Sequence, residues 1–283
     1  MMQPAFHIGD PDQALQATGC RLLVEISGQS FNYILFRADP AELLLLRQYR
    51  LYTTGDRSTR DLIDEVIQGD PLLQQHAANA LVVYNFPEAN LVPDDYYHTG
   101  LHASVTELIY GEDDNECVFG EKVRDQDMHN VYRVPGDIHQ LLKSKFSGSQ
   151  YWHFYTLLLL SPDAVQTDKQ EVIKAVFYHD KFIAAFYSGG RLQMIQTFNY
   201  QTPEDVAYYL LLMAQQLNVP QANVVLSISG MIDRQSSLYT ELQKYFREVY
   251  EEGLPAGISV NGLLEEFPPH YFSPLLKMSL CGL

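Results

Sequence analysis

One order of secondary-structure elements is predicted twice along this chain of 283 residues, and that repetition constrains the fold most. Residues 172–228 contain three β-rich runs separated by turn-length gaps, then a helical pattern, then an apolar run typical of a buried strand. Residues 21–84 contain the same order. The sequence therefore predicts an α/β protein with two similar subdomains. We expect the first to span 1–163 and the second 164–283.

The helix in each copy begins with the same capping signal. Ser58 is followed three residues later by Asp61, and Thr202 is followed by Asp205 at the same spacing. This is the spacing of a capping box, in which two side chains satisfy backbone N–H groups at the helix start. Pro203 also suits the first position of a helix. Both helices should therefore begin directly after these Ser and Thr residues.

The rest of the chain completes the two copies or is inserted between them. A long buried strand is expected at 151–160, and a short strand near 257–263. A strand pair is expected at 116–123 and 129–134. Helices are expected at 102–111, 136–146, 236–250 and 273–280, and the last of these is open to packing on either subdomain.

Charge and apolar patterning exclude several classes of function. The formal net charge is −16 and Lys and Arg are not clustered, which disfavours nucleic acid and anionic membrane surfaces as partners. The longest apolar runs, 154–160 and 207–214, are much shorter than the roughly 20 residues that span a bilayer, so no membrane insertion is expected. The N-terminal sequence lacks a signal-peptide pattern, which indicates a cytoplasmic protein.

Metal binding is not expected from the residues that could supply ligands. Cys20, Cys117 and Cys281 are odd in number and far apart, which argues against disulfides and a thiolate zinc site. His98 and His102 have the spacing of ligands on a helix, but Thr99 and Gly100 between them favour a polar loop. The acidic turn at 112–116 lacks the spacing of a calcium loop and predicts a solvated hairpin tip.

Three segments together resemble a known family. They are "NFPEANLVPDDYY" at 85–97, the block at 136–160, and "PPHYFSPLLKMSL" at 268–280. They resemble the DUF3822 family of uncharacterised Bacteroidetes proteins, and the similarity extends over roughly residues 15–280. This resemblance implies a duplicated actin-like ATPase fold of the RNase H-like type, in which two subdomains flank a central cleft. It does not imply an activity.

The actin-like resemblance also implies where a nucleotide would bind. Such ATPases carry an acidic residue at the end of the first strand of each half, followed by small residues that let backbone N–H groups approach the phosphates. In the first half Glu25, Ser27 and Gly28 take these places. The alternative is that Glu25 is an outward-facing strand residue beside a polar hairpin.

The second half departs from this pattern. Residues 177–179, Phe-Tyr-His, stand where an acid and glycines belong, and Asp180 comes late enough to be a hairpin-turn residue. Ser229 and Gly230 occupy the place of a third, glycine-rich turn. Met231 and Ile232 follow this pair, and their side chains would fill the space of the nucleoside. Ser229-Gly230 is therefore expected to be a strand-to-loop turn.

Two functions remain open from the sequence. The first is a non-catalytic, actin-like protein that has no cofactor and acts through contacts with an unidentified protein partner, in a scaffold or assembly role. The second is a nucleotide-dependent enzyme, an ATPase or small-molecule kinase, that binds ATP and Mg²⁺ in the cleft. Its candidate cofactor-binding residues are Glu25, Ser27, Gly28, Asp180, Ser229 and Gly230.

Overall fold

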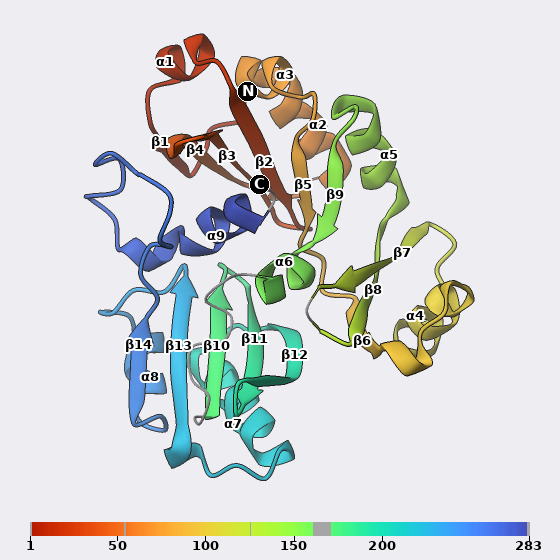
Figure 1. Cartoon of the computed structure of the whole chain (residues 1–283), viewed down its shortest axis with the longest axis vertical. Coiled ribbons are helices and arrows are strands. Elements are labelled where there is room, and N and C mark those ends of the chain that lie inside the picture. The colour runs from red at the N-terminus through yellow and green to blue at the C-terminus, as the bar shows by residue number, and fades with distance from the viewer. Residues whose placement is uncertain (1, 54, 125, 161–170, 282–283) are drawn as a thin grey trace. The chain divides into compact units, whose positions relative to one another are not determined.

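The computed structural model describes residues 2–53, 55–124, 126–160 and 171–281, which divide into two compact units (Figure 1). Unit 1 comprises Met1–Leu160, Gly257–Leu263 and Met278–Leu283, and unit 2 comprises Ser161–Ala256 and Leu264–Lys277. The expected boundary between residues 163 and 164 lies outside the described residues. None of the helices in the described ranges is long and apolar enough to cross a membrane.

Unit 1 contains a mixed six-stranded sheet. The strand β2 runs antiparallel to β3 and parallel to β5, and β3 continues antiparallel to β4. In spatial order the strands are β1 (Phe6–Ile8), β4 (Ala41–Arg50), β3 (Ser30–Ala38), β2 (Cys20–Ile26), β5 (Leu81–Tyr84) and β9 (Gln150–His153). The central strands are almost completely buried, which explains their continuous apolar sequence.

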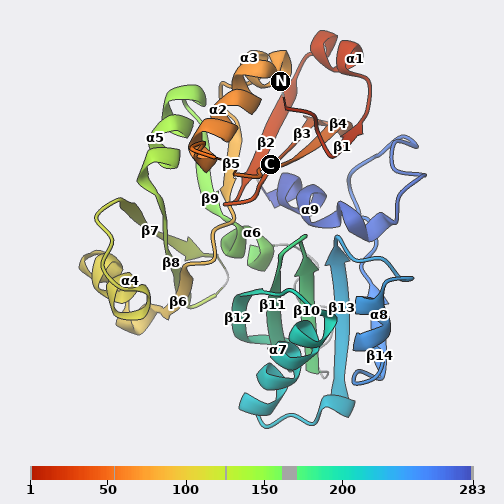
Figure 2. The ribbon, with the colours of Figure 1, turned by 180° about the vertical axis from the view of Figure 1, so that it is seen from behind.

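Unit 2 repeats this sheet with the same connections. In spatial order its strands are β12 (Arg191–Asn199), β11 (Lys181–Ser188), β10 (Glu171–Phe177), β13 (Val224–Gly230) and β14 (Glu248–Glu251). Strand β10 is antiparallel to β11 and parallel to β13, as β2 is to β3 and β5. Helices α7 (Pro203–Gln216) and α8 (Ser237–Leu242) cover one face of the sheet (Figure 2). The predicted duplication is therefore confirmed.

Both predicted capping boxes are present. The hydroxyl of Ser58 accepts a hydrogen bond from the Asp61 N–H, and the Asp61 carboxylate accepts one from the Ser58 N–H, at the start of α2 (Thr59–Gly69). Thr202 and Asp205 exchange the same two bonds at the start of α7. Helix α2 lies between β4 and β5, and α7 lies between β12 and β13. These strands have equivalent places in the two sheets, so the two caps lie at equivalent points of the duplicated fold.

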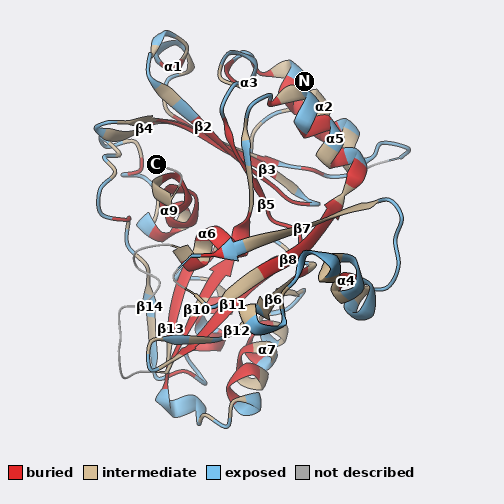
Figure 3. Ribbon diagram, turned by 45° about the vertical axis from the view of Figure 1, so that its right-hand side comes forward, coloured by how far each residue is buried: buried red, intermediate tan, exposed pale blue. Residues whose placement is uncertain are grey.

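An insertion after β5 adds a small three-stranded sheet to unit 1. Its strands are β6 (Ala89–Pro93), β8 (Met128–Pro135) and β7 (Glu116–Val123), in that spatial order. Helix α4 (His102–Tyr110) packs on this sheet, and Figure 3 shows how much of α4 remains exposed. The other helices are α1 (Pro11–Gln16), α3 (Pro71–Gln75), α5 (Gly136–Lys145), α6 (Phe154–Leu160) and α9 (Ser273–Cys281), with 3₁₀ turns at Asp94–Tyr96, Thr99–Leu101, Gln221–Asn223 and Pro269–Tyr271.

Four sequence-based expectations about these elements are wrong. The acidic turn at 112–116 is not a hairpin tip, because it connects α4 to β7. The apolar run at 151–160 is not one strand, because β9 ends at His153 and α6 begins at Phe154. The helix expected at 236–250 ends at Leu242 and is followed by β14, which pairs with β13. Near 257–263 the chain forms an isolated bridge between Ser259 and Glu42, not a strand. Short apolar runs fit either secondary structure, and tertiary pairing decides between them.

Candidate functional site

The turn between β2 and β3 is closed by its own serines. Ile26 pairs with Phe31, and the Ser27 N–H donates to the Ser30 carbonyl oxygen at 2.9 Å. The Ser27 hydroxyl accepts hydrogen bonds from the N–H groups of Gln29 and Ser30, at 3.2 and 3.0 Å. Three backbone donors of this turn are thus used inside the turn itself. These are the kind of donor that would bind a phosphate.

Glu25 is buried, with 1% of its surface exposed, so the interpretation as an outward-facing strand residue is wrong. Its Oε2 accepts a hydrogen bond from the Asn32 side-chain amide at 3.0 Å, and its Oε1 accepts one from Asn85 at 2.6 Å. A buried carboxylate needs such donors, because desolvation would otherwise be costly. Asn32 lies directly opposite Glu25 in the hairpin, whereas Asn85 follows β5. Sequence reasoning missed both asparagines.

Gly28 leaves an open space at the tip of this turn. A Cβ atom added to Gly28 would meet no other atom within 4 Å. The Gly28 carbonyl oxygen accepts a hydrogen bond from the Thr59 hydroxyl at 3.3 Å, which connects the turn to the first residue of α2. Of the three candidate residues in unit 1, only Gly28 has the steric openness that a phosphate turn requires.

The equivalent turn of unit 2, between β10 and β11, is bulky. Phe177 pairs with Phe182, and the Tyr178 N–H donates to the Lys181 carbonyl oxygen at 2.8 Å. The Lys181 ammonium lies 5.3 Å from the centre of the Tyr178 ring, a cation–π contact. Asp180 lies within this turn, as expected for a hairpin residue, and its backbone oxygen accepts a hydrogen bond from the Tyr200 N–H at 3.1 Å.

Asp180 has an electrostatic effect on a tyrosine of its own unit. Burial, and after it the charge of Asp180, raises the pKa of Tyr200. The Tyr200 hydroxyl donates to the Tyr178 carbonyl oxygen at 2.8 Å. The Tyr200 hydroxyl thus stabilises the turn of unit 2 through this hydrogen bond.

Gly230 is required by the backbone of β10. Its φ angle is +80°, and an added Cβ atom would lie 2.2 Å from the Phe177 carbonyl oxygen. The same oxygen accepts a hydrogen bond from the Met231 N–H at 2.8 Å. Ser229 is 2% exposed and pairs with Val176 inside the sheet. Packing between adjacent strands therefore explains this Ser-Gly pair without a ligand.

The residues after Gly230 belong to the interior of unit 2. Ile232 is 2% exposed and is part of the apolar core that α7 and α8 cover. Its carbonyl oxygen contacts the ring Nε2 of His270 at 2.7 Å. The six candidate residues thus form two groups: Glu25, Ser27 and Gly28 at one hairpin of unit 1, and Asp180, Ser229 and Gly230 at one end of β10 and β13 in unit 2.

Among the described residues, no group of three His, Cys, Asp or Glu side chains is arranged to hold a metal ion. His102, one of the two histidines whose spacing would suit metal ligands on a helix, is hydrogen-bonded to the Tyr97 hydroxyl at 2.7 Å. Tyr97 stacks on His129 with ring centres 3.5 Å apart, and burial followed by the charge of His129 lowers the pKa of His102. These side chains form a packed aromatic group on the small sheet.

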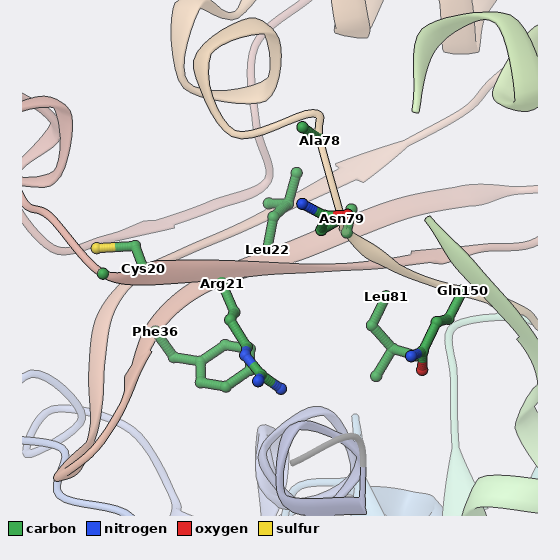
Figure 4. A pocket seen from close by; sticks show the side chains of 10 residues that line it. Cys20, Arg21, Leu22, Phe36, Ala78, Asn79, Leu81 and Gln150 are labelled. Atoms are coloured by element: carbon green, nitrogen blue, oxygen red, sulfur yellow. The ribbon is translucent and has the colours of Figure 1, made fainter. Parts of the chain in front are cut away.

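A pocket of about 490 Å³ lies in unit 1, at the opposite end of β2 from Glu25 (Figure 4). Cys20, Arg21, Asn79 and Gln150 supply its polar lining. Burial raises the pKa of the Cys20 thiol, which keeps it protonated and weakens it as a nucleophile. The pocket therefore combines polar side chains with no activated catalytic group among them.

The repeated sheet and its connections define a protein with the actin-like ATPase fold. A structure from Bacteroides thetaiotaomicron, a protein with actin-like ATPase fold and unknown function, superimposes with a TM-score of 0.74. The two sequences are 15% identical, and the match covers 84% of this chain and 92% of the other. More particularly, the chain belongs to the DUF3822 family, described as a protein of unknown function, whose sequence profile matches residues 10–249. The expected family and fold are confirmed.

A second similar structure is the PilM–PilN type IV pilus biogenesis complex, with a TM-score of 0.58 and 12% identity. The match covers 93% of this chain and 98% of that one. No curated protein is similar enough to the chain to count as a match. At these identities the structural similarity establishes the fold alone, and function must be argued from the site.

Proposed function

We propose that this chain is a non-catalytic, actin-like protein that acts through protein–protein contacts. One observation carries the proposal: the turns that would bind phosphate use their backbone donors internally. In unit 1 the donors of Ser27, Gln29 and Ser30 bond within the turn, and in unit 2 those of Tyr178 and Met231 bond to neighbouring strand residues. A phosphate could use these five donors only by breaking the hydrogen bonds that they already make.

The side chains at the same places also support the proposal. Both carboxylate oxygens of Glu25 already accept amide hydrogen bonds, which opposes a role in holding Mg²⁺. In unit 2 the place equivalent to Glu25 is occupied by Val176 and not, as expected from the sequence, by Phe177, because Ile26 and Phe177 are the last paired residues of the two hairpins. An acid is therefore missing from one half and hydrogen-bonded in the other.

The partner is proposed to be another protein. The structural similarity to PilM–PilN, which is a complex of two proteins, supports this class of function by analogy of fold. The net charge of −16 opposes a nucleic-acid partner. We further propose that the protein is cytoplasmic and binds no cofactor.

The open space at Gly28 favours one alternative, a nucleotide-dependent enzyme. A phosphate could approach the backbone there without meeting a side chain. In this alternative Glu25 would orient Mg²⁺, and Ser27 and Gly28 would contact phosphate.

Isothermal titration calorimetry with ATP and with ADP, each with and without Mg²⁺, tests the two functions. We expect no binding heat at nucleotide concentrations up to the millimolar range. Micromolar, Mg²⁺-dependent binding that disappears in Glu25→Gln would instead contradict the proposal and call for an assay of nucleotide turnover. Glu25→Gln keeps the size of the side chain, and circular dichroism of that variant confirms that a lost signal is not lost folding. Asp180→Asn is the matched variant for unit 2.

A further inference from the structure

Strand β12 forms one edge of the unit 2 sheet and is the longest of the edge strands in the described ranges (Figure 1). It has nine residues, whereas the edge strands β1, β9, β14, β6 and β7 have three, four, four, five and eight. Proteins protect an open edge by keeping it short or by placing charged residues on it. Strand β7 carries three charged residues, Glu116, Glu121 and Lys122. Strand β12 carries one, Arg191 at its first position, so it is the least protected of these edges.

The backbone of β12 has hydrogen-bonding groups on the side away from β11. The Tyr200 N–H, directly after β12, donates to the Asp180 carbonyl oxygen at 3.1 Å. Residues of an antiparallel pair alternate between bonding to the neighbouring strand and pointing away from it. By this alternation the N–H and carbonyl groups of Ile195 and Asn199 point away from β11. No strand in the described ranges pairs with that side of β12, so the edge is open to a further strand.

Most of β12 is regular enough to pair. Its pairing with β11 is irregular between Phe186 and Tyr187, which lie opposite the first part of β12. Residues Met194–Asn199 pair with β11 without interruption. A bulge twists an edge strand and hinders pairing, so the regular part of the strand is the part that can accept a second strand.

A groove of about 430 Å³ lies beside this edge, between β12 and α7. It is lined by Met194, Gln196 and Phe198 of β12 and by Tyr209, Leu212 and Gln216 of α7, among others. Tyr208, which is 62% exposed, lies one helical turn before Leu212 and therefore borders the groove. The edge and the groove together form a surface that combines backbone hydrogen-bonding groups with partly exposed apolar side chains.

This surface is uncharged, although the chain has a net charge of −16. Residues 192–199 and residues 206–219 contain no Asp, Glu, Lys or Arg. The nearest acid on the helix, Asp205, accepts hydrogen bonds from the N–H groups of Gln201 and Thr202 at the start of α7. A charged partner would find no complementary charge here. Two copies of this surface, in contrast, meet without placing like charges opposite each other.

We propose that β12 pairs with β12 of a second copy of this chain, so that the two unit 2 sheets join into one. Antiparallel pairing about a two-fold axis is self-complementary, because each copy offers the same backbone groups to the other. With the axis perpendicular to the sheet, the second α7 lies on the same face of the joined sheet as the first, where it can cover the groove. A single strand from another protein would pair with the edge but would bring no helix to cover the groove. The inference goes beyond the proposed function and does not depend on whether nucleotide binds.

Light scattering after size-exclusion chromatography tests this pairing on the full chain. We expect the measured mass to rise from that of a monomer to that of a dimer between about 1 and 100 µM protein, the range of a weak dimer. Added salt should favour the dimer, because it screens the repulsion between two chains of net charge −16. Hydrogen exchange in residues 191–199 should slow as the dimer forms, since the outward N–H groups become hydrogen-bonded.

A charge introduced on the edge should weaken the dimer. Gln196→Lys should do so at least about tenfold, because it brings two ammonium groups to the same face of the joined sheet and buries them there. Gln196 is exposed, so the variant should remain folded, which circular dichroism checks. The control is Gln243→Lys, the same substitution at an exposed position directly after α8, and it should leave the dimer unchanged.

Every other outcome overturns the proposal. If the chain stays a monomer over this range but binds a synthetic peptide with the sequence of residues 191–199, the edge belongs to a strand of another protein. A monomer that does not bind this peptide would mean that the edge accepts no strand. A dimer that Gln196→Lys leaves unchanged, or that forms without slower exchange in residues 191–199, would place the interface elsewhere. Nucleotide binding in the calorimetric test would overturn the proposed function and leave the light-scattering result unaffected.

Discussion

The turn of unit 1 at 27–30 and the turn of unit 2 at 178–181 have the same backbone hydrogen bonds and differ in all four residues. In each, the N–H of the first residue donates to the carbonyl oxygen of the fourth, at 2.9 Å in unit 1 and 2.8 Å in unit 2. At the end of β2 the Ile26 carbonyl oxygen accepts a hydrogen bond from the N–H of Asn85, the residue after β5, at 2.8 Å. At the end of β10 the Phe177 carbonyl oxygen accepts one from the N–H of Met231, the residue after β13, also at 2.8 Å. The sequence of the turn is Ser-Gly-Gln-Ser in unit 1 and Tyr-His-Asp-Lys in unit 2.

This comparison separates what the fold requires from what a phosphate site requires. The shared hydrogen bonds are all between backbone groups, so the duplicated frame tolerates very different side chains. Small residues and an acid are needed only if a nucleotide binds. In unit 2 Val176 stands where unit 1 has Glu25, and bulky side chains stand where unit 1 has Ser27 and Gly28, yet the same sheet forms.

Two buried glutamates, one in each unit, are stabilised in different ways. In unit 1 neutral amides donate to Glu25. In unit 2 the carboxylate of Glu252 lies 2.8 Å from the Lys277 ammonium and 3.8 Å from that of Lys174. Burial alone would raise the pKa of Glu252, but the two lysines hold it below its ordinary value of 4.5. Glu252 therefore depends on charged partners, whereas Glu25 depends on neutral hydrogen bonds.

The largest effect is expected when this charge pair is broken. Lys277→Met keeps the length of the side chain and leaves Glu252 buried with a weaker counter-charge, which should cost about 3 kcal/mol of unfolding free energy in urea at neutral pH. Lys244→Met is the control, because Lys244 is exposed and its pairing with Glu241 should contribute about 1 kcal/mol or less.

The pH dependence of unfolding tests the same Glu252–Lys277 pair. Since the pKa of Glu252 is lower in the folded chain than its ordinary value of 4.5, its stabilising effect is complete above that pH and is lost as the pH falls through the folded-state pKa. The difference between wild type and Lys277→Met should therefore shrink at about pH 3.5. A difference of the same size at both pH values would mean that Lys277 acts through packing alone.

The order of elements was predictable because it depends on local signals. Ser58 and Thr202 form the expected capping boxes, and the turn-length gaps separate the strands as expected. The run at 151–160 was not predictable in this way. The His153 ring, completely buried, accepts a hydrogen bond from the Tyr155 N–H at 3.1 Å, and this contact starts a helix where the apolar pattern continues. Such a switch depends on side-chain placement, which periodicity does not report.

The candidate site shows the same limit of local reasoning. The sequence placed Asp180 in a turn and Ser229-Gly230 at the end of a strand, where the structure has them. The burial of Glu25 depends on Asn85, which is 60 residues away along the chain and comes next to it only through the parallel pairing of β2 and β5. Likewise, the need for Gly230 comes from the Phe177 carbonyl on another strand.

A smaller effect distinguishes the two glycines of the candidate site. Gly230→Ala would place a Cβ atom against the Phe177 carbonyl oxygen at a φ of +80°, and should destabilise the chain by about 2–3 kcal/mol in urea unfolding. Gly28→Ala would meet no atom within 4 Å, and should change stability by about 0.5 kcal/mol or less. Equal effects of the two substitutions would contradict the assignment of Gly230 to backbone packing.

The smallest effect is expected at the serine that closes the unit 1 turn. Ser27→Ala removes the hydroxyl that accepts from the N–H groups of Gln29 and Ser30, and should cost about 1 kcal/mol in urea unfolding. His179→Ala, at an exposed position of the unit 2 turn, should cost about 0.5 kcal/mol or less.

The two N–H groups that Ser27→Ala frees would also become available to a phosphate. If Ser27→Ala gained binding of ATP in calorimetry, the internal hydrogen bonds would be what closes this turn to nucleotide. Unchanged stability would instead mean that the Ser27 hydroxyl does not hold the turn together.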